Sequence, residues 1–121
     1  MKSAEKGNAK AMCNVGYCYE NGDGVTQDKT KAFEWWLKSA QKGDPNAMHN
    51  VGVCYHNGEG VAQFKTKAFE WLLKAAENGF TDAMFNLGVF YQDGDGVEQD
   101  YEKAFGWFLK AANNGNEKAI D

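Results

Sequence analysis

The chain has 121 residues, the size of a single domain, and its 43% hydrophobic and 14% aromatic residues are typical of a globular protein. Its formal charge is −4 and every basic side chain is a lysine, so it lacks the guanidinium groups that favour phosphate recognition, and we expect no nucleic-acid partner. No stretch approaches the roughly 18 apolar residues of a membrane span, and no apolar signal segment follows Met1, which predicts a soluble protein, cytoplasmic as the sequence stands, without membrane insertion.

A step of 36 residues runs through the whole sequence. Such a fixed internal period is the signature of a repeat protein, in which each repeat is one supersecondary unit. The step predicts a single domain over residues 1–121, with three repeats at 8–43, 44–79 and 80–115. The rows that keep it include Gly7, Gly43, Gly79 and Gly115; Gly16, Gly52 and Gly88; Tyr19, Tyr55 and Tyr91; and Trp35, Trp71 and Trp107.

Each repeat is predicted to be a helical hairpin, preceded at the start of the chain by residues 1–7, which match the end of a repeat. In the second repeat, apolar residues spaced by three and four predict a first helix over residues 44–57 and a second helix over residues 65–78. Gly58 and Gly60 separate the two helices, because glycine adopts left-handed conformations at little steric cost.

Two positions in the second repeat bear on how well its hairpin is held. Gly52 lies inside the first helix, where glycine costs about 1 kcal/mol against alanine, so we expect another helix to pack directly against the backbone there. Asp28 and Asp100 precede the other two second helices and are expected to cap them. Phe64 takes this place in the second repeat, and its helix start should be weaker by roughly 1 kcal/mol.

The end of the chain, residues 116–121, matches the first turn of a first helix and is expected to begin a further helix. A solenoid usually needs polar capping repeats, and neither end of the sequence has one. Two explanations stay open: the chain belongs to a longer array, or its uncapped ends pair with another copy in a homo-oligomer.

The repeats share the pattern Ala-x-x-x-Val/Leu-Gly-x-x-Tyr-x-x-Gly-x-Gly-Val-x-x-Asp-x-x-Lys-Ala-x-x-Trp-x-x-Lys-Ala-Ala-x-x-Gly, which is complete from Ala83 to Gly115. This pattern resembles the Sel1-like repeat family, relatives of the tetratricopeptide repeats, and it covers the whole chain. The resemblance implies an all-α fold, a right-handed α/α superhelix of about three helix-turn-helix repeats of 36 residues. It also implies a scaffold or adaptor that binds a partner protein or peptide on its concave face.

The residues expected to face a partner lie between the motif positions of the first helices. If the hairpins stack as in tetratricopeptide repeats, the first helices line the inner surface, and these variable positions point into a groove. The predicted rows are Lys10, Asn46 and Asp82; Cys13, His49 and Phe85; Asn14, Asn50 and Asn86; Tyr17, Val53 and Val89; and Glu20, His56 and Gln92.

The asparagine row has two explanations. Side-chain amides donate and accept hydrogen bonds, so the row could hold the backbone of an extended peptide; alternatively, it bonds to neighbouring helices. A second set, Tyr17, His49, Val53, Phe85 and Val89, could anchor apolar side chains of a partner or serve ordinary packing between adjacent first helices.

Metal and cofactor sites are not expected. The three cysteines lack the paired spacing of a zinc site, and Cys18 and Cys54 lie one repeat apart, at a helix-packing distance of about 8–10 Å that exceeds disulfide reach. Residues 93–96 read Asp-Gly-Asp-Gly, like the start of a calcium loop, but the later ligand positions fall on Val97 and Ala104, which offer no side-chain oxygen.

The sequence favours a binding protein over an enzyme. A cysteine-rich branch of the resembling family carries one disulfide per repeat, and activity is claimed for some members, but this chain lacks that spacing. Cys13 and His49 could pair as nucleophile and base, yet no residue supplies a third orienting group or an oxyanion hole. Our first hypothesis is therefore a peptide-binding scaffold, the second a self-assembling structural module without a peptide ligand, and the third a thiol-dependent or hydrolytic enzyme.

Overall fold

The computed structural model describes the backbone of residues 2–120 and the side chains of residues 7–114. Within residues 2–120 the chain is entirely helical and forms three successive hairpins, so the predicted all-α fold of three helix-turn-helix repeats is confirmed. No helix in this part of the chain is both long and apolar enough to cross a membrane. The helices are α1 (Lys2–Asn21), α2 (Lys29–Gln41), α3 (Pro45–Asn57), α4 (Lys65–Glu77), α5 (Thr81–Asp93) and α6 (Tyr101–Ile120).

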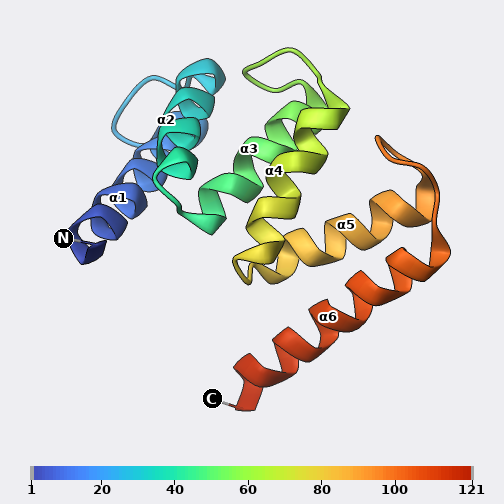
Figure 1. The fold of residues 1–121 in the computed structure, drawn as a ribbon. Helices are drawn as coiled ribbons and strands as arrows, with labels where there is room; N and C mark the ends of the chain where they lie inside the picture. The colour runs from blue at the N-terminus through green and yellow to red at the C-terminus, as the bar shows by residue number, and fades with distance from the viewer. Residues whose placement is uncertain (1, 121) are drawn as a thin grey trace.

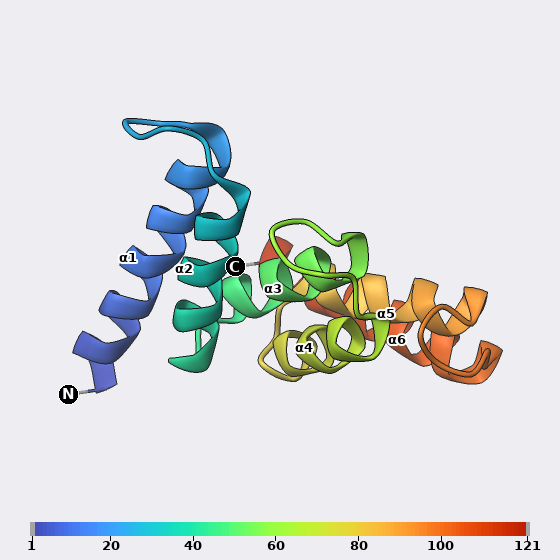
Figure 2. The same cartoon turned by 90° about the horizontal axis from the view of Figure 1, so that it is seen from above.

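The hairpins follow one another in chain order, as Figure 1 shows. Within each hairpin the two helices pack together, and α2 with α3 and α4 with α5 join neighbouring hairpins. Seen from above in Figure 2, the hairpin of α1 and α2 is turned steeply relative to that of α5 and α6. This rotation from repeat to repeat is what makes a solenoid a superhelix.

A glycine in each first helix makes room for a large side chain of the second helix. A Cβ atom on Gly52 would lie 2.6 Å from Leu72, and one on Gly88 would lie 2.6 Å from the ring of Phe108. Real Cβ atoms do not approach so closely, so glycine is required at these places. The predicted close approach is confirmed, but what mainly fills the space is a side chain and not a helix backbone.

Neighbouring repeats are joined by an aromatic pair that recurs at the 36-residue step. The ring of Phe33 on α2 meets Tyr55 on α3 edge to face at 5.3 Å, and Phe69 on α4 meets Tyr91 on α5 at 5.6 Å. Such pairs add about 0.5–1.5 kcal/mol beyond the apolar area that they bury.

Ion pairs repeat at the same two junctions. Lys29 lies 3.3 Å from Glu59, and Lys65 lies 2.8 Å from Asp95, so the start of each second helix is tied to the loop of the following repeat. These pairs are largely exposed to solvent and contribute little to the free energy of unfolding. Their value lies in fixing the register of one hairpin against the next.

The two ends differ from the expectation. Helix α1 continues through Gly7, and α6 continues through Gly115 to Ile120, so residues 116–120 extend α6 and do not begin a separate helix. At the equivalent Gly43, helix α2 has ended and the chain turns. The backbone N–H of Asp44 donates to the Ser39 carbonyl, and the next helix, α3, packs against α2.

The helix caps agree with the sequence. The carboxylates of Asp28 and Asp100 each accept a hydrogen bond from the backbone N–H three residues later, at 3.1 Å. Phe64 precedes α4 with the same extended backbone but has no side-chain cap, and its side chain is 48% exposed. The second hairpin therefore has the weakest helix start of the three second helices.

We expect the Phe64→Asp variant to raise the free energy of unfolding by about 1 kcal/mol, because the new carboxylate can accept the free backbone N–H of Lys67. Denaturant unfolding followed by circular dichroism measures the change. Phe64→Ala removes the ring without adding a cap and is the control; equal stability of the two variants would show that no cap forms.

Candidate functional site

The face formed by the first helices is built from side chains that bridge neighbouring repeats. Tyr17 on α1 donates its hydroxyl to the Oδ1 atom of Asn46 at 3.1 Å and accepts a hydrogen bond from the Nδ2 atom of Asn50 at 2.9 Å. Asn46 and Asn50 lie one turn apart on α3, so the tyrosine is held between them. This small network fixes the first-helix face between repeats one and two.

A different pair bridges the next two repeats. The Nδ2 atom of Asn86 on α5 lies 3.1 Å from the Nε2 atom of His49 on α3, and because an amide nitrogen only donates, the imidazole accepts there. Burial lowers the pKa of His49 below its usual value, and Asp82 opposes this shift. His49 is therefore neutral at neutral pH, as its acceptor role requires.

The asparagine row is thus not uniform. Asn50 and Asn86 bond to the preceding first helix, which is the alternative that the sequence left open for these residues. Asn14 is exposed, and no hydrogen bond of its side chain occurs among residues 7–114. Of the three amides, that of Asn14 is the one fully available to a partner.

The other predicted groove residues differ in exposure. Cys13 is 2% exposed and belongs to the core, because the Asn50 amide lies over its Sγ atom at 3.9 Å, so it does not face the groove as expected. The remaining residues keep part or all of their surface. Half-buried are Tyr17, Glu20, Asn46, His49, Asn50, Val53, His56, Asn86 and Val89; exposed are Lys10, Asn14, Asp82, Phe85 and Gln92.

A hollow of about 150 Å³ opens between α1 and α3. Five of its lining residues belong to the predicted groove rows. The sequence does not predict the other three as lining residues: Trp36 of the second helix, Glu59 of the loop, and Cys54, which is expected only to be a free thiol. One sequence signal for them is the comparison of equivalent positions, since Cys54 and Glu59 lie 36 residues before Phe90 and Asp95 of the next junction. The lining residues are Tyr17, Glu20, Trp36, His49, Asn50, Val53, Cys54 and Glu59.

The corresponding place between repeats two and three is occupied by the chain itself. The imidazole of His56 stacks on the ring of Phe90 at 5.0 Å, and its Nε2 atom lies 2.8 Å from Asp95. The hydrogen bonds from His56 and then Lys65 lower the pKa of the Asp95 carboxyl. His56 therefore serves the junction between two repeats.

An open, mainly apolar depression of about 700 Å³ lies on α5 and α6. Phe85 is 55% exposed there and rests against Phe108, with ring centroids 5.4 Å apart. Its lining also includes Ala112, which is exposed, whereas the equivalent Ala40 and Ala76 are covered by the next hairpin. The depression is therefore the surface on which a further hairpin would stack.

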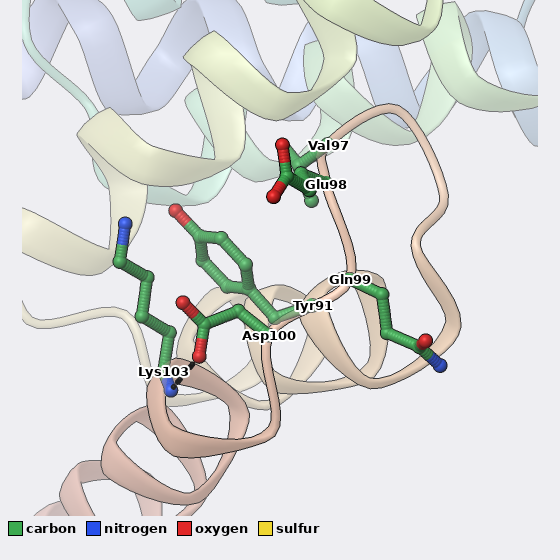
Figure 3. Close-up of a pocket in the computed structure, with 6 residues that line it drawn as sticks. All are labelled: Tyr91, Val97, Glu98, Gln99, Asp100 and Lys103. Carbon is green, nitrogen blue, oxygen red and sulfur yellow. Dashed lines mark hydrogen bonds between the residues drawn. The ribbon is translucent and has the colours of Figure 1, made fainter.

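A fourth region, drawn in Figure 3, surrounds Tyr91 and the loop that leads into α6. Two of its polar side chains already have structural partners. Asp100 accepts from the backbone N–H of Lys103 and caps α6, and Gln99 donates to the carbonyl of Gln92 at 2.8 Å. The ammonium of Lys103 lies 5.5 Å from the centre of the Tyr91 ring. These contacts hold the loop, and we assign no binding role to this hollow.

Comparison with known proteins bears on the family. Residues 9–44, 45–80 and 81–116 each match the model of the Sel1 repeat. A Sel1 repeat protein from Oxalobacter formigenes is 36% identical, with a TM-score of 0.86 over 92% of this chain and 45% of that one. A protective antigen of uropathogenic Escherichia coli with an SLR fold is 43% identical, with a TM-score of 0.86 over 93% of this chain and 24% of that one.

A third similar structure is cysteine rich protein B of Helicobacter pylori, 25% identical, with a TM-score of 0.74 over 99% of this chain and 95% of that one. No curated protein sequence matches the chain. The chain spans less than half the length of the Oxalobacter and Escherichia proteins, so the activities of those whole proteins do not transfer to it.

The three cysteines are free, and the two buried ones, Cys13 and Cys54, are poorly suited to nucleophilic chemistry. Burial, followed by the nearby Asp44 carboxylate, raises the pKa of the Cys13 thiol to about 12. Burial, followed by Glu59 and Glu20, raises that of Cys54 to about 12 as well. The described part of the chain contains no group of three or more His, Cys, Asp or Glu residues arranged to hold a metal ion. The cysteines with raised pKa values therefore argue against the thiol-enzyme hypothesis.

We expect Cys18 to react with iodoacetamide at neutral pH well before Cys13 and Cys54. Cys13 and Cys54 are buried, and a rise of their pKa from 9.0 to about 12 lowers the fraction of thiolate roughly a thousandfold. Peptide mass spectrometry after timed labelling measures the three rates. Labelling in guanidinium chloride, where the three rates should converge, is the control; equal rates in the folded protein would refute the protection.

Proposed function

The chain belongs to the Sel1 repeat family, whose repeats generally mediate protein interactions, and from this premise we propose that it binds an extended peptide segment of a partner protein across α1 and α3. The hollow between these helices carries the proposal. It opens on the face where the variable positions of the first helices gather, and Tyr17, His49 and Val53 line it.

The surroundings of the hollow suit an extended chain. Asn14 and Lys10 are exposed on α1, about one and two turns before Tyr17, and within residues 7–114 no hydrogen bond or ion pair engages their amide and ammonium groups. Tyr17, Asn46 and Asn50 are held by one another, so this part of the face is pre-organised and would lose little conformational entropy on binding. An extended peptide needs such polar groups for its backbone and a recess for a side chain.

The test is selection of peptides from a random display library on the folded chain, followed by affinity measurement through fluorescence anisotropy. We expect Val53→Lys, which places an ammonium at the rim of the hollow, to weaken a selected peptide by about tenfold or more. Thr66→Lys, which adds the same charge on the exposed side of α4, is the matched control and should leave the affinity within about twofold.

Asn14→Ala tests the amide contribution separately, because no hydrogen bond of Asn14 within the described residues is lost with it. Asn50→Ala is unsuitable for this purpose, since it removes the bond to Tyr17 and alters the junction between repeats. Peptides that bind equally well to Val53→Lys and to the unaltered chain would place the working surface elsewhere.

A second candidate function is self-assembly through the end faces, and one observation favours it. Phe105 on α6 is 66% exposed, whereas the equivalent Phe33 is 7% exposed and packs on Tyr55 of the next repeat. Tyr19 on α1 is the equivalent of Tyr55 and has no such ring partner among residues 7–114. Phe105 of one copy could therefore pack on Tyr19 of another.

If this second candidate holds, sedimentation velocity will show association that grows with concentration and is abolished by Phe105→Lys, because a charge on the stacking face prevents burial. Phe64→Lys makes the same change at another exposed phenylalanine, away from that face, and should leave association intact. A monomer at all concentrations would exclude self-assembly through these faces.

A further inference from the structure

We propose that the hollow between α1 and α3 is a specificity pocket for one basic side chain, an arginine or a lysine, of the bound peptide. This inference rests on the proposed function and deepens it by naming the chemistry of the partner. It is argued from the space in the hollow, its charges, its walls, and the contrast with the other junction of the same chain.

The two junctions differ at several positions, and one of them bears directly on the space. Phe90 fills the junction between repeats two and three with its ring, and the equivalent residue between repeats one and two is Cys54. The smaller side chain leaves a hollow of about 150 Å³. This space suits the end of one long side chain and is too small for a folded element.

The charges around the hollow favour a cation. Two carboxylates, Glu20 and Glu59, line it, and a single ammonium, that of Lys29, pairs with Glu59 at 3.3 Å. The Glu20 carboxylate makes no hydrogen bond or ion pair within the part of the chain whose side chains are described. His49 adds no positive charge at neutral pH, because burial lowers its pKa. Lys29 lines an adjoining gap together with both carboxylates, so two negative charges share one positive charge at the edge of the recess.

The walls of the hollow provide aromatic surface for the same ligand. The rings of Tyr17 and Trp36 meet edge to face at 5.3 Å, and both line the hollow. A guanidinium or ammonium group is attracted to the face of an aromatic ring, and the attraction grows as water is excluded. A half-buried recess with an aromatic wall and a free carboxylate binds a cation better than either group does alone.

The other junction shows the same chemistry completed within the chain. There the imidazole of His56 lies between the ring of Phe90 and the carboxylate of Asp95. The position of His56 is taken by Glu20 in the first repeat, so the first junction has an added acid where the second has a base. A basic group brought by a partner would supply there what His56 supplies in the second junction.

The probes for the experiment are N-acetyl-arginine methylamide and N-acetyl-citrulline methylamide, which have nearly the same shape but differ in charge. Titration of the isotope-labelled chain, followed through its backbone amide NMR signals, measures both dissociation constants. We expect saturable shifts at Glu20, Cys54 and Glu59 with the arginine probe and about tenfold weaker binding of the citrulline probe.

Three variants locate the effect. Glu20→Gln should weaken the arginine probe by about five- to tenfold, while Glu34→Gln, which removes an exposed carboxylate from α2, should change its affinity less than about twofold. Cys54→Phe copies the ring of the third repeat into the hollow and should abolish the shifts. The spectrum of each variant without probe shows whether it is folded.

Equal binding of the two probes overturns the pocket, because it shows that the charge of the ligand plays no part. Equal loss in Glu20→Gln and Glu34→Gln also overturns it and indicates diffuse attraction to an acidic protein. The same holds if the probe causes no saturable shift at all. If only the pocket proposal is wrong, peptides selected by display still bind the face but are not enriched in arginine or lysine. If the proposed function is wrong, no selected peptide has an affinity that depends on Val53. The two failures are therefore distinguishable.

Discussion

Each hairpin closes on a large side chain that reaches across to a glycine of the facing helix. Trp36 lies against Gly16, Leu72 against Gly52, and Phe108 against Gly88. A methyl group at any of these glycines would collide with that side chain, so the separation of the two helices depends on the bare backbone. Since the stacking surfaces are shared between both helices of a hairpin, the contacts between repeats depend on this closure as well.

Stacking then repeats one set of contacts at both junctions. Phe33 with Tyr55 and Phe69 with Tyr91 bury the aromatic surface, and the lysine at the start of each second helix reaches the acidic residue of the next loop. No hairpin can bury its own outer surface, so an exposed residue such as Phe105 follows directly from the architecture. The packing between repeats and the exposure of Phe105 therefore have the same physical origin.

Much of this structure could be predicted from the sequence because the period fixes the helices and their breaks. The spacing of apolar residues located α3 and α4 to within a residue, and the missing cap at Phe64 followed from one changed position. What could not be predicted depended on three-dimensional neighbours. The burial of Cys13 results from an amide one repeat away, and the hollow combines residues of α1, α2, α3 and a loop.

The contrast between the two junctions also separates residues that support the fold from those that recognise a partner. A residue type that recurs in the repeats can be explained by a structural contact that recurs with it. Asn50 and Asn86, for example, each form a hydrogen bond to the preceding first helix. Regularity alone is therefore weak evidence for a binding ladder. Where equivalent positions of the two junctions differ, the contact between the repeats changes. Cys54 stands where the second junction has the ring of Phe90 and leaves space, and Glu20 stands where it has His56 and adds a negative charge. Both changes fall at the same junction, and together they produce a recess lined by two carboxylates that share the one ammonium of Lys29 among the described residues.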